Sequence, residues 1–333
     1  MAVITYRQAL NDTLAEELAR DPNVYLMGEE IGKFEGSYKI TAGLLQKFGP
    51  KRVVDTPIAE MGFVGMAAGS AMLGLRPVVE IMTINFILMA VDQVVNHASK
   101  IHYMFGGQSK VPMVIRTPSG GVGQLAATHS QSFENWFAYC PGMKVVAPST
   151  PYDAKGLLRA SIRDDDPVVF IESLPLYDTK GEVPENDDFT VPIGMAEVKK
   201  EGTDITVVAY SRMTYVAMQV AKKLEEEQGL SVEVVDLRSL RPLDRPTIVN
   251  SVKKTNRAVI IEEDWRSYGI GAEVAATIQE EAFDFLDAPI RRVAGLEVPL
   301  PYAEHLSRAS KPDAQDLVDA IRLTMEGTGK WRT

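Results

Sequence analysis

The sequence predicts an α/β protein built from two doubly wound domains with mainly parallel sheets. Short runs rich in β-branched residues alternate with longer helical patterns along the whole chain. These runs lack the apolar–polar alternation of a half-exposed strand, as expected for strands that helices cover on both faces. The chain has 333 residues, which is enough for two ordinary domains with a core each.

The first half of the chain begins with a predicted helix. Thr5 and Gln8 have capping-box spacing, and leucines follow at every fourth position from residue 10 to residue 18. We predict further helices at 62–73, 86–103 and 152–163. Strands are predicted between them at 24–27, 53–55, 78–82, 113–116, 144–147 and 168–172. This alternation favours a parallel sheet with helices on each side.

The alternation of predicted strands and helices stops at "LYDTKGEVPENDDFTVPIG", residues 176–194, which is rich in acidic residues, Pro and Gly. We expect a linker at 179–194, between a first domain of residues 1–178 and a second of residues 195–333. Predicted strands then resume at 205–210, 232–236 and 258–262, with helices near 213–227, 270–283 and 313–326. The second domain is therefore expected to be a smaller α/β domain.

Composition excludes several classes of partner. The formal net charge of −10 disfavours nucleic acid and membrane surfaces, because both require a basic face. Cys140 is the only cysteine, so no disulfide within the chain and no CxxC zinc site is possible. The first residues do not have the pattern of a secretory signal, and no apolar run is long enough to span a bilayer. We expect a reducing compartment and no targeting segment.

Glu60 is an isolated carboxylate in "DTPIAEMGFVGMAAGSAMLGLRPVVEIM", residues 55–82. Thr56 is predicted to cap a helix that begins at Pro57, and Glu60 would then interact with the helix dipole for less than about 1 kcal/mol. Alternatively, its apolar neighbours bury it at a cost that a polar ligand must offset. A buried carboxyl of this kind suits proton exchange with a ligand nitrogen. Spacing alone leaves both interpretations open.

A second segment, "RTPSGGVGQLAATHSQSFENW" at 116–136, follows a predicted strand. Gly121, Gly123 and Ala126 match a dinucleotide-binding fingerprint, but neither an immediate helix nor the required acidic residue follows, and we reject that interpretation. His129 lies in this loop, beyond the carboxyl end of a strand, where α/β folds place ligands. An imidazole can donate or accept a proton near neutral pH, so a catalytic role and a loop hydrogen bond are equally favoured.

"IRDDDPVV", residues 162–169, contains three adjacent aspartates. Spacing alone favours a solvated turn over a cation site of turn carbonyls and a carboxylate. The sequence contains neither a G-x-x-x-x-G-K-[ST] loop nor a G-x-S-x-G nucleophile elbow, and no pair of residues typical of a metal-bound diphosphate site. The chain thus offers acid–base candidates without an anchor for a phosphorylated cofactor, as if it held half of an active site.

Four motifs identify a family. "LMGEEIGKFEGSYKIT", "RVVDTPIAEMGFVGMAAGSAMLGLRPVVEIMTINF", "THSQSFENWFAYCPGMKVVAPS" and "GLEVPLPYA" closely resemble the β subunits of the thiamine-diphosphate-dependent pyruvate dehydrogenase component, of the bacterial and plastid type. The resemblance covers nearly the whole chain. It implies an N-terminal thiamine-pyrimidine-binding domain and a transketolase C-terminal-like domain. The implied function is oxidative decarboxylation of pyruvate with transfer of the acetyl group to lipoamide.

The resemblance also implies roles for single residues. Glu60 would hydrogen-bond the pyrimidine N1′ of thiamine diphosphate and activate it, Phe86 would stack on the pyrimidine, and Met82 would line the same pocket. His129 would handle the substrate or the reductive acetylation of lipoamide. A potassium ion would be held, mostly by backbone carbonyls, at Met113, Ser161, Ile162, Asp164 and Asp166.

The missing diphosphate anchor follows from the same resemblance. Members of the family place Mg²⁺ and the diphosphate on an α subunit, in an assembly of two α and two β chains that docks a dihydrolipoyl acetyltransferase core. The nearest alternatives are branched-chain 2-oxo acid and acetoin dehydrogenase β subunits. A self-sufficient thiamine or dinucleotide enzyme and a non-catalytic assembly subunit are the rivals from other classes. The expected compartment is a bacterial cytoplasm or a plastid stroma.

Overall fold

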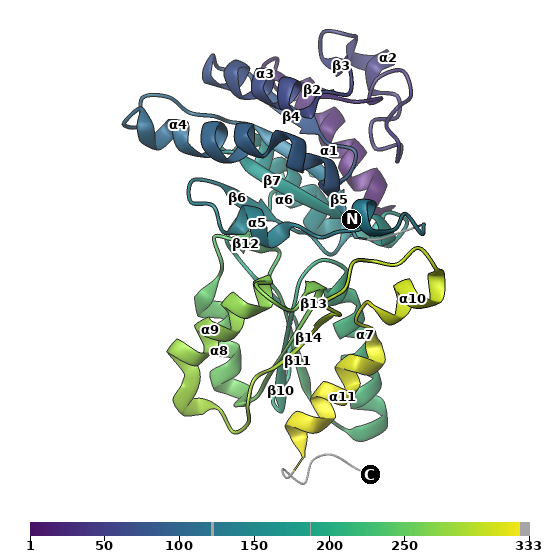
Figure 1. Ribbon diagram of the computed structural model, residues 1–333, viewed down its shortest axis with the longest axis vertical. Coiled ribbons are helices and arrows are strands. Elements are labelled where there is room, and N and C mark those ends of the chain that lie inside the picture. Colours follow the sequence, from purple (N-terminus) through teal and green to yellow (C-terminus); the bar gives the residue numbers. More distant parts are fainter. Residues whose placement is uncertain (121–122, 187, 327–333) are drawn as a thin grey trace. The chain divides into compact units, whose positions relative to one another are not determined.

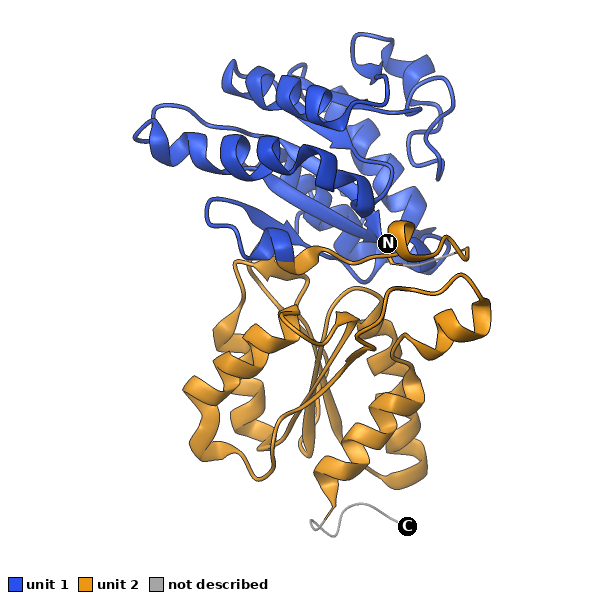
Figure 2. Cartoon of the chain, in the orientation of Figure 1, with its two compact units in different colours: residues 1–119, 136–193 blue, residues 120–135, 194–333 orange. Residues whose placement is uncertain are grey.

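The computed structural model describes residues 1–120, 123–186 and 188–326, and its elements are shown in Figure 1. Gly121, one residue of the rejected dinucleotide fingerprint, lies outside the described residues. The chain forms two compact units (Figure 2). The first comprises Met1–Ser119 and Trp136–Ile193, and the second Gly120–Asn135 and Gly194–Thr333. The loop 120–135 thus groups with the second half of the chain, a long-range association that local sequence patterns do not reveal.

The central sheet of the first unit is parallel. Its strands run in the order β6-β7-β5-β4-β2-β3. They are β2 (Val24–Gly28), β3 (Val53–Asp55), β4 (Arg76–Glu80), β5 (Val114–Ser119), β6 (Lys144–Val146) and β7 (Val168–Ser173). Each corresponds to a strand that the sequence predicted. β5 and β7 are buried along their whole length, and their charged residues Arg116 and Glu172 are buried with them.

Helices cover this sheet, and Figure 1 shows them on both of its faces. They are α1 (Tyr6–Arg20), α2 (Leu44–Phe48), α3 (Glu60–Met72), η1 (Ile84–Ala90), η2 (Gln93–Ala98), α4 (Ser99–Met104), α5 (Glu134–Ala138), α6 (Pro151–Arg163) and η4 (Leu174–Leu176). The predicted helix at 86–103 is a continuous stretch of 3₁₀, π and α turns. One core cluster joins α1, α6 and the strands beneath them.

The two predicted caps have different outcomes. Thr5 is the N-cap of α1, and its hydroxyl accepts a hydrogen bond from the Gln8 amide at 3.1 Å. The predicted cap by Thr56 is wrong. Helix α3 begins at Glu60 with Ala59 as its N-cap residue, and among the described residues the buried Thr56 hydroxyl has no hydrogen-bond partner. The Thr56 amide instead donates to the Gly28 carbonyl at 3.0 Å, so this segment extends the edge of the sheet before the helix starts.

The segment expected to be a linker is partly structured. Strand β8 (Lys180–Val183) pairs in antiparallel register with β1 (Ala2–Thr5), and Thr5 lies opposite Lys180. The structure therefore extends the first unit to Ile193. Pairing across such a distance in sequence leaves no local periodicity from which to predict it.

The second unit is a smaller α/β unit with a five-stranded sheet in the order β14-β13-β10-β11-β9. β9 is antiparallel to β11, and the other pairs are parallel. The strands of this sheet are β9 (Glu197–Lys200), β10 (Ile205–Ala209), β11 (Val232–Asp236), β13 (Ala258–Trp265) and β14 (Arg291–Gly295). Besides this sheet, the unit contains the short strand β12 (Ser239–Arg241). Its helices are η3 (Ala127–His129), α7 (Arg212–Gln228), α8 (Arg245–Thr255), α9 (Ile270–Ala282), η5 (Phe283–Phe285), α10 (Glu304–Ala309) and α11 (Ala314–Met325). None of the helices in the described part of the chain is long and apolar enough to cross a membrane.

A buried ion-pair network crosses the sheet of the first unit. The Arg116 guanidinium on β5 donates to both carboxylate oxygens of Glu172 on β7 and to one of Glu80 on β4, and the Tyr177 hydroxyl donates to Glu172. Arg116 and both glutamates are buried. Burial of these charges is tolerated because each meets an opposite charge with directed hydrogen bonds. The network therefore links three neighbouring strands.

Candidate active site

Glu60 lies on the buried stripe of helix α3. The buried residues of this helix are Glu60, Phe63, Val64, Ala67, Ala68 and Ala71, which have the 3-, 4-, 7-, 8- and 11-residue spacings of one helix face. The Glu60 side chain is 7% exposed. Among the described residues its carboxylate forms neither a hydrogen bond nor an ion pair, although its place in the first turn favours a negative charge. A polar group from outside these residues would therefore lower the cost of its burial.

Glu29 is a second buried carboxylate beside Glu60. It was not among the site residues predicted from the sequence. It follows β2 directly and is 6% exposed, and its Oε1 atom has no hydrogen-bond partner among the described residues. Burial and, as the second cause, the nearby charge of Glu60 together raise the pKa of Glu29 to about 7. The position at the carboxyl end of a parallel strand was its only signal in the sequence. Glu29 can thus hold a proton near neutral pH.

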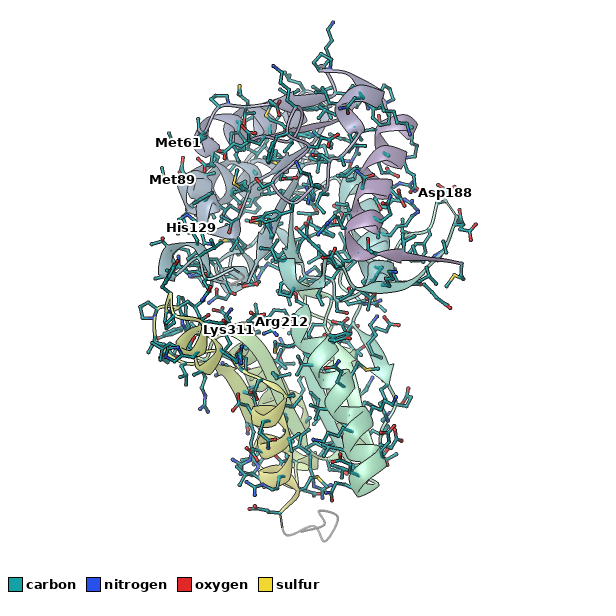
Figure 3. The ribbon with its side chains drawn as sticks, turned by 90° about the vertical axis from the view of Figure 1, so that its right-hand side faces the viewer. Met61, Met89, His129, Asp188, Arg212 and Lys311 are labelled. Carbon is teal, nitrogen blue, oxygen red and sulfur yellow. The ribbon has the colours of Figure 1, made fainter. Side chains whose placement is uncertain are left out.

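The outer face of α3 is apolar and open. Met61, Met66 and Met72 are exposed, and a methyl group added at Gly69 would meet no atom within 4 Å. Gly65 has another function, because a methyl group there would lie 3.0 Å from the Gln93 side chain of η2. Figure 3 shows Met61 and the exposed Met89 of η1 on the same flank of the first unit. Exposed methionines and bare glycines along one flank are typical of a surface that a partner covers.

Met82 and Phe86 belong to the same unit as Glu60. Both are half-buried and lie just after β4, where the Phe86 amide donates to the Thr83 carbonyl at 2.9 Å and starts η1. Helix α3 packs against η1. The structure therefore places the three residues on adjacent segments of one unit.

His129 lies in the second unit, at the end of the short η3 helix. Its side chain is exposed, and Nδ1 lies 2.9 Å from the Thr128 hydroxyl. The loop before it is strained, since Gln124 and Ala126 have φ angles of 57° and 63°, in the left-handed region that favours glycine. An exposed imidazole on a strained loop is accessible to a reactant.

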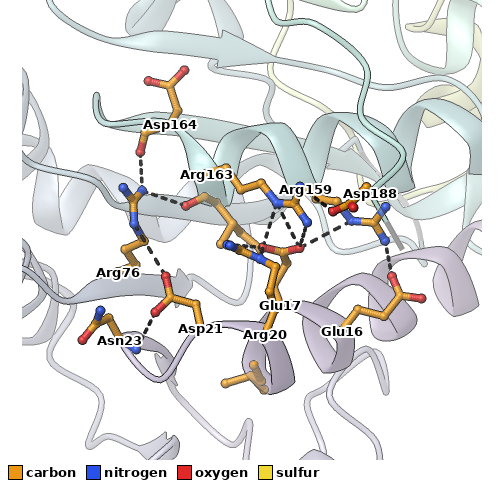
Figure 4. Close-up of polar contacts among 12 residues, drawn as sticks. Glu16, Glu17, Arg20, Asp21, Asn23, Arg76, Arg159, Arg163, Asp164 and Asp188 are labelled. Carbon is orange, nitrogen blue, oxygen red and sulfur yellow. Dashed lines mark hydrogen bonds and ion pairs between the residues drawn. The ribbon is translucent and has the colours of Figure 1, made fainter. Parts of the chain in front are cut away.

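Three of the residues predicted to hold potassium, Ile162, Asp164 and Asp166, already have cationic partners near the end of α6, and Figure 4 shows Arg76 bonded to Asp164. The Arg76 guanidinium donates to the Ile162 carbonyl at 3.1 Å and to the Asp164 carbonyl at 2.8 Å. The Lys144 ammonium lies 2.7 Å from the Asp164 carboxylate and 3.1 Å from that of Asp166. Among the described residues no group of three or more acidic, histidine or cysteine side chains could hold a metal. A potassium ion here would therefore depend on the second lone pairs of the carbonyls.

Comparison with known proteins assigns both units. The transketolase pyrimidine-binding domain family matches residues 2–180, and the transketolase C-terminal domain family matches residues 194–317. The chain is 50% identical over 323 residues to the pyruvate dehydrogenase E1 component subunit beta of Rhizobium meliloti (strain 1021), covering 97% of this chain and 70% of that protein. It is 48% identical over 319 residues to the subunit of that name in Rickettsia felis, covering 96% of this chain and 97% of that protein.

The chain belongs to the pyruvate dehydrogenase E1 β-subunit family. The predicted two-domain transketolase-like fold is confirmed. A solved structure described as "split gene transketolase, inactive beta4 tetramer" is also similar. It has a TM-score of 0.78 and 26% sequence identity, and the match covers 99% of both chains.

Family membership supports thiamine diphosphate as the cofactor. The first unit fits its pyrimidine ring, because Glu60 is a buried carboxylate without a partner among the described residues and Phe86 offers an aromatic face near α3. The ring nitrogens and amino group of a pyrimidine are the groups that a buried carboxylate can bind. No comparable cradle for a diphosphate was predicted from this chain.

Proposed function

We propose that this chain is the β subunit of a pyruvate dehydrogenase, in which it binds the pyrimidine end of thiamine diphosphate. The observation that carries the proposal is the placement of Glu60, which lies on the buried stripe of α3 with no hydrogen-bond partner among the described residues. The relatives at about half identity along nearly the whole chain support pyruvate as the substrate. The full reaction would oxidatively decarboxylate pyruvate and transfer the acetyl group to lipoamide.

Glu60 would act on the cofactor by holding a proton at the pyrimidine N1′ atom. Bound thiamine diphosphate supplies an acidic thiazolium carbon that becomes a nucleophile and stabilises the electrons left by decarboxylation. The apolar walls of α3 would exclude water and strengthen the single hydrogen bond from Glu60. Phe86 and Met82 would orient the pyrimidine, and His129 would donate or accept a proton on the substrate or on the lipoyl group.

An α subunit would complete the site. The exposed apolar flank of α3 and η1 supports a protein partner there, and the similar solved structure of a split gene transketolase is described as an inactive beta4 tetramer. The partner would hold the diphosphate and its Mg²⁺ in an assembly of two α and two β chains. A dihydrolipoyl acetyltransferase would bind this assembly.

Potassium is a further proposed ligand. The carbonyls of Met113, Ser161, Ile162 and Asp164 each accept a hydrogen bond from the protein and keep a second lone pair. A monovalent cation bound there would join the C-terminus of α6 to the start of β5. The proposed compartment is a bacterial cytoplasm or a plastid stroma.

The decisive test is cofactor binding and turnover with and without an α chain. Calorimetry with thiamine diphosphate and Mg²⁺ should give weak binding to the β chain alone and binding at least about 100-fold tighter after assembly with α. The assembled Glu60→Gln variant should lose at least about 100-fold in pyruvate decarboxylation, measured with an artificial electron acceptor. Tight binding by the β chain alone would indicate a self-sufficient enzyme. Full activity of Glu60→Gln would indicate an assembly subunit.

Substrate choice can be measured on the same preparation. A pyruvate dehydrogenase should have a kcat/KM for pyruvate at least about tenfold above that for 3-methyl-2-oxobutanoate, because extra methyl groups must fit a pocket shaped for a smaller chain. The reverse order would identify a branched-chain enzyme.

A further inference from the structure

The loop that carries His129 is anchored on its C-terminal side. Residues 123–129 are exposed or half-buried, whereas Ser130, Ser132, Phe133 and Glu134 are buried. The Asn135 side-chain amide then donates to the Tyr268 carbonyl at 3.0 Å. The position of His129 is therefore set by whatever holds residues 130–135 in place.

The anchor rests on the end of strand β13. Ser130, Gln131 and Ser132 line a cavity of about 20 Å³ together with Glu263, Asp264 and Trp265. This volume suits a single water molecule. The cavity thus has polar side chains both from the anchored segment and from the end of β13.

Two of the three consecutive acids of β13 have cationic partners. The Glu262 carboxylate accepts hydrogen bonds from the Gly271 amide at 2.8 Å and from the Arg292 guanidinium at 3.1 Å. The Glu263 carboxylate accepts one from Arg212 at 2.8 Å. Burial raises the pKa of Glu262, and the hydrogen bonds from Gly271 and Arg292 offset part of that rise.

Asp264 differs from these neighbours. It is 4% exposed, its Oδ1 atom accepts a hydrogen bond from the Trp265 amide at 2.7 Å, and its buried Oδ2 atom has no partner among the described residues. Burial and, as the second cause, the charge of Glu134 at the start of α5 together raise the pKa of Asp264 to about 8. The buried Tyr210 hydroxyl also has no hydrogen-bond partner among the described residues. Burial raises the pKa of Tyr210, and the charges of Glu134 and Asp264 are among those that raise it further.

We propose that Asp264 is a positioning residue that, together with Glu134, fixes the His129 loop against strand β13. A neutral Asp264 removes the repulsion between two buried carboxylates, whereas a charged one would favour release of the loop into water. The other ionisable groups that face Asp264 are Glu262, Glu297 and Tyr210, and Glu263 and Lys311 line the same cavity. This inference rests on the proposed function, because anchoring of the loop affects turnover only if His129 takes part in the reaction.

The sign of the pH dependence follows from the two states of the loop. In the closed loop Asp264 keeps its proton up to about pH 8, whereas in an open, hydrated loop its pKa would be about 3.9. Opening therefore releases a proton between these values and becomes easier as pH rises, by up to about tenfold per pH unit. Above pH 8 the dependence should level off.

Hydrogen–deuterium exchange of the α/β holoenzyme tests the proposal. Between pH 6 and pH 8 the protection factors of residues 127–135 should fall at least about tenfold in the wild type, after correction for intrinsic exchange rates. In Asp264→Asn, which cannot ionise, they should change less than about threefold. The matched control, Asp284→Asn, replaces an exposed aspartate of the same unit and should behave as wild type.

Turnover gives the second readout. Asp264→Ala should lower the overall rate with lipoamide at least about fivefold without changing the KM for pyruvate, and Asp264→Asn should restore the rate to within about twofold at pH 6. Parallel loss of protection in Asp264→Asn and wild type, or full turnover of Asp264→Ala, would overturn the proposal. Full activity of His129→Ala would instead contradict the proposed role of His129 and leave the exchange result valid.

Discussion

Glu60 is a side chain that is costly to bury and that could nevertheless be recognised in the sequence as a candidate site residue. Its apolar neighbours in the sequence made burial one of two open interpretations, and the structure places it on the buried stripe of α3. Its role in binding the cofactor comes from the family resemblance and stays a proposal. Glu29 and Asp264 could not be found in the same way, because the groups that perturb them lie at distant positions in the sequence. The pKa values of Glu29 and Asp264 are shifted only once folding has brought these groups together at the ends of the strands.

The raised pKa of Glu29 predicts a pH-dependent stability. A carboxyl whose folded pKa is about 7 rather than 4.5 stabilises the fold below pH 4.5, and this contribution is lost as pH rises to 7. Glu29→Gln cannot ionise, so it should match the wild type at pH 4 and exceed its free energy of unfolding by about 1–3 kcal/mol at pH 8. Urea denaturation at the two pH values measures this difference. An equal difference at both would exclude ionisation of Glu29 as the cause.

Elements that depend on local periodicity were predicted well. Strand β3 coincides with its predicted range, and α6 begins one residue before its own. Strand β8 was missed because its partner β1 lies at the opposite end of the first unit's sequence. Helix α3 starts later than the predicted Thr56 cap would place it, because the Thr56 amide still bonds to β2. In both places the structure depends on backbone hydrogen bonds to residues far away in the sequence, which local patterns do not reveal.

The buried network of Arg116 predicts a large stability loss on truncation. Arg116→Met would leave Glu172 and Glu80 as buried charges without their cationic partner, and it should lower the free energy of unfolding by about 3–5 kcal/mol. Chemical denaturation of the β chain at pH 7 measures this loss.

A matched control separates this loss from a general effect of replacing arginine. Arg266 is exposed, and Arg266→Met should change the free energy of unfolding by less than about 0.5 kcal/mol. Equal stabilities of the two variants would show that the network does not contribute as described.

At the scale of the whole molecule, the two features to compare with the sequence are the division into two units and the exposed apolar flank of α3. The predicted two-domain class is confirmed, but the loop 120–135 joins the second unit, which no local pattern indicated. The apolar character of the flank was visible in the sequence as methionines and glycines. Its exposure became clear only when the buried stripe of α3 was known.

This flank predicts an assembly defect. Met66 is exposed on α3, and Met66→Glu would place a charge where an apolar partner surface is expected. The variant β chain should fold normally but bind α at least about tenfold more weakly, as measured by native mass spectrometry of mixed chains. Lys223→Glu, an exposed change on α7, is the control. Unimpaired assembly of Met66→Glu would place the α contact elsewhere.

The central claim is that the Glu60 carboxylate activates thiamine diphosphate through its pyrimidine. The most direct measurement is the rate at which the thiazolium C2 proton exchanges with deuterium in the assembled enzyme, with wild type and Glu60→Gln compared at equal cofactor occupancy. The account predicts exchange at least about 100-fold slower in Glu60→Gln, because the amide cannot exchange a proton with N1′. Equal exchange rates in the two proteins would contradict it.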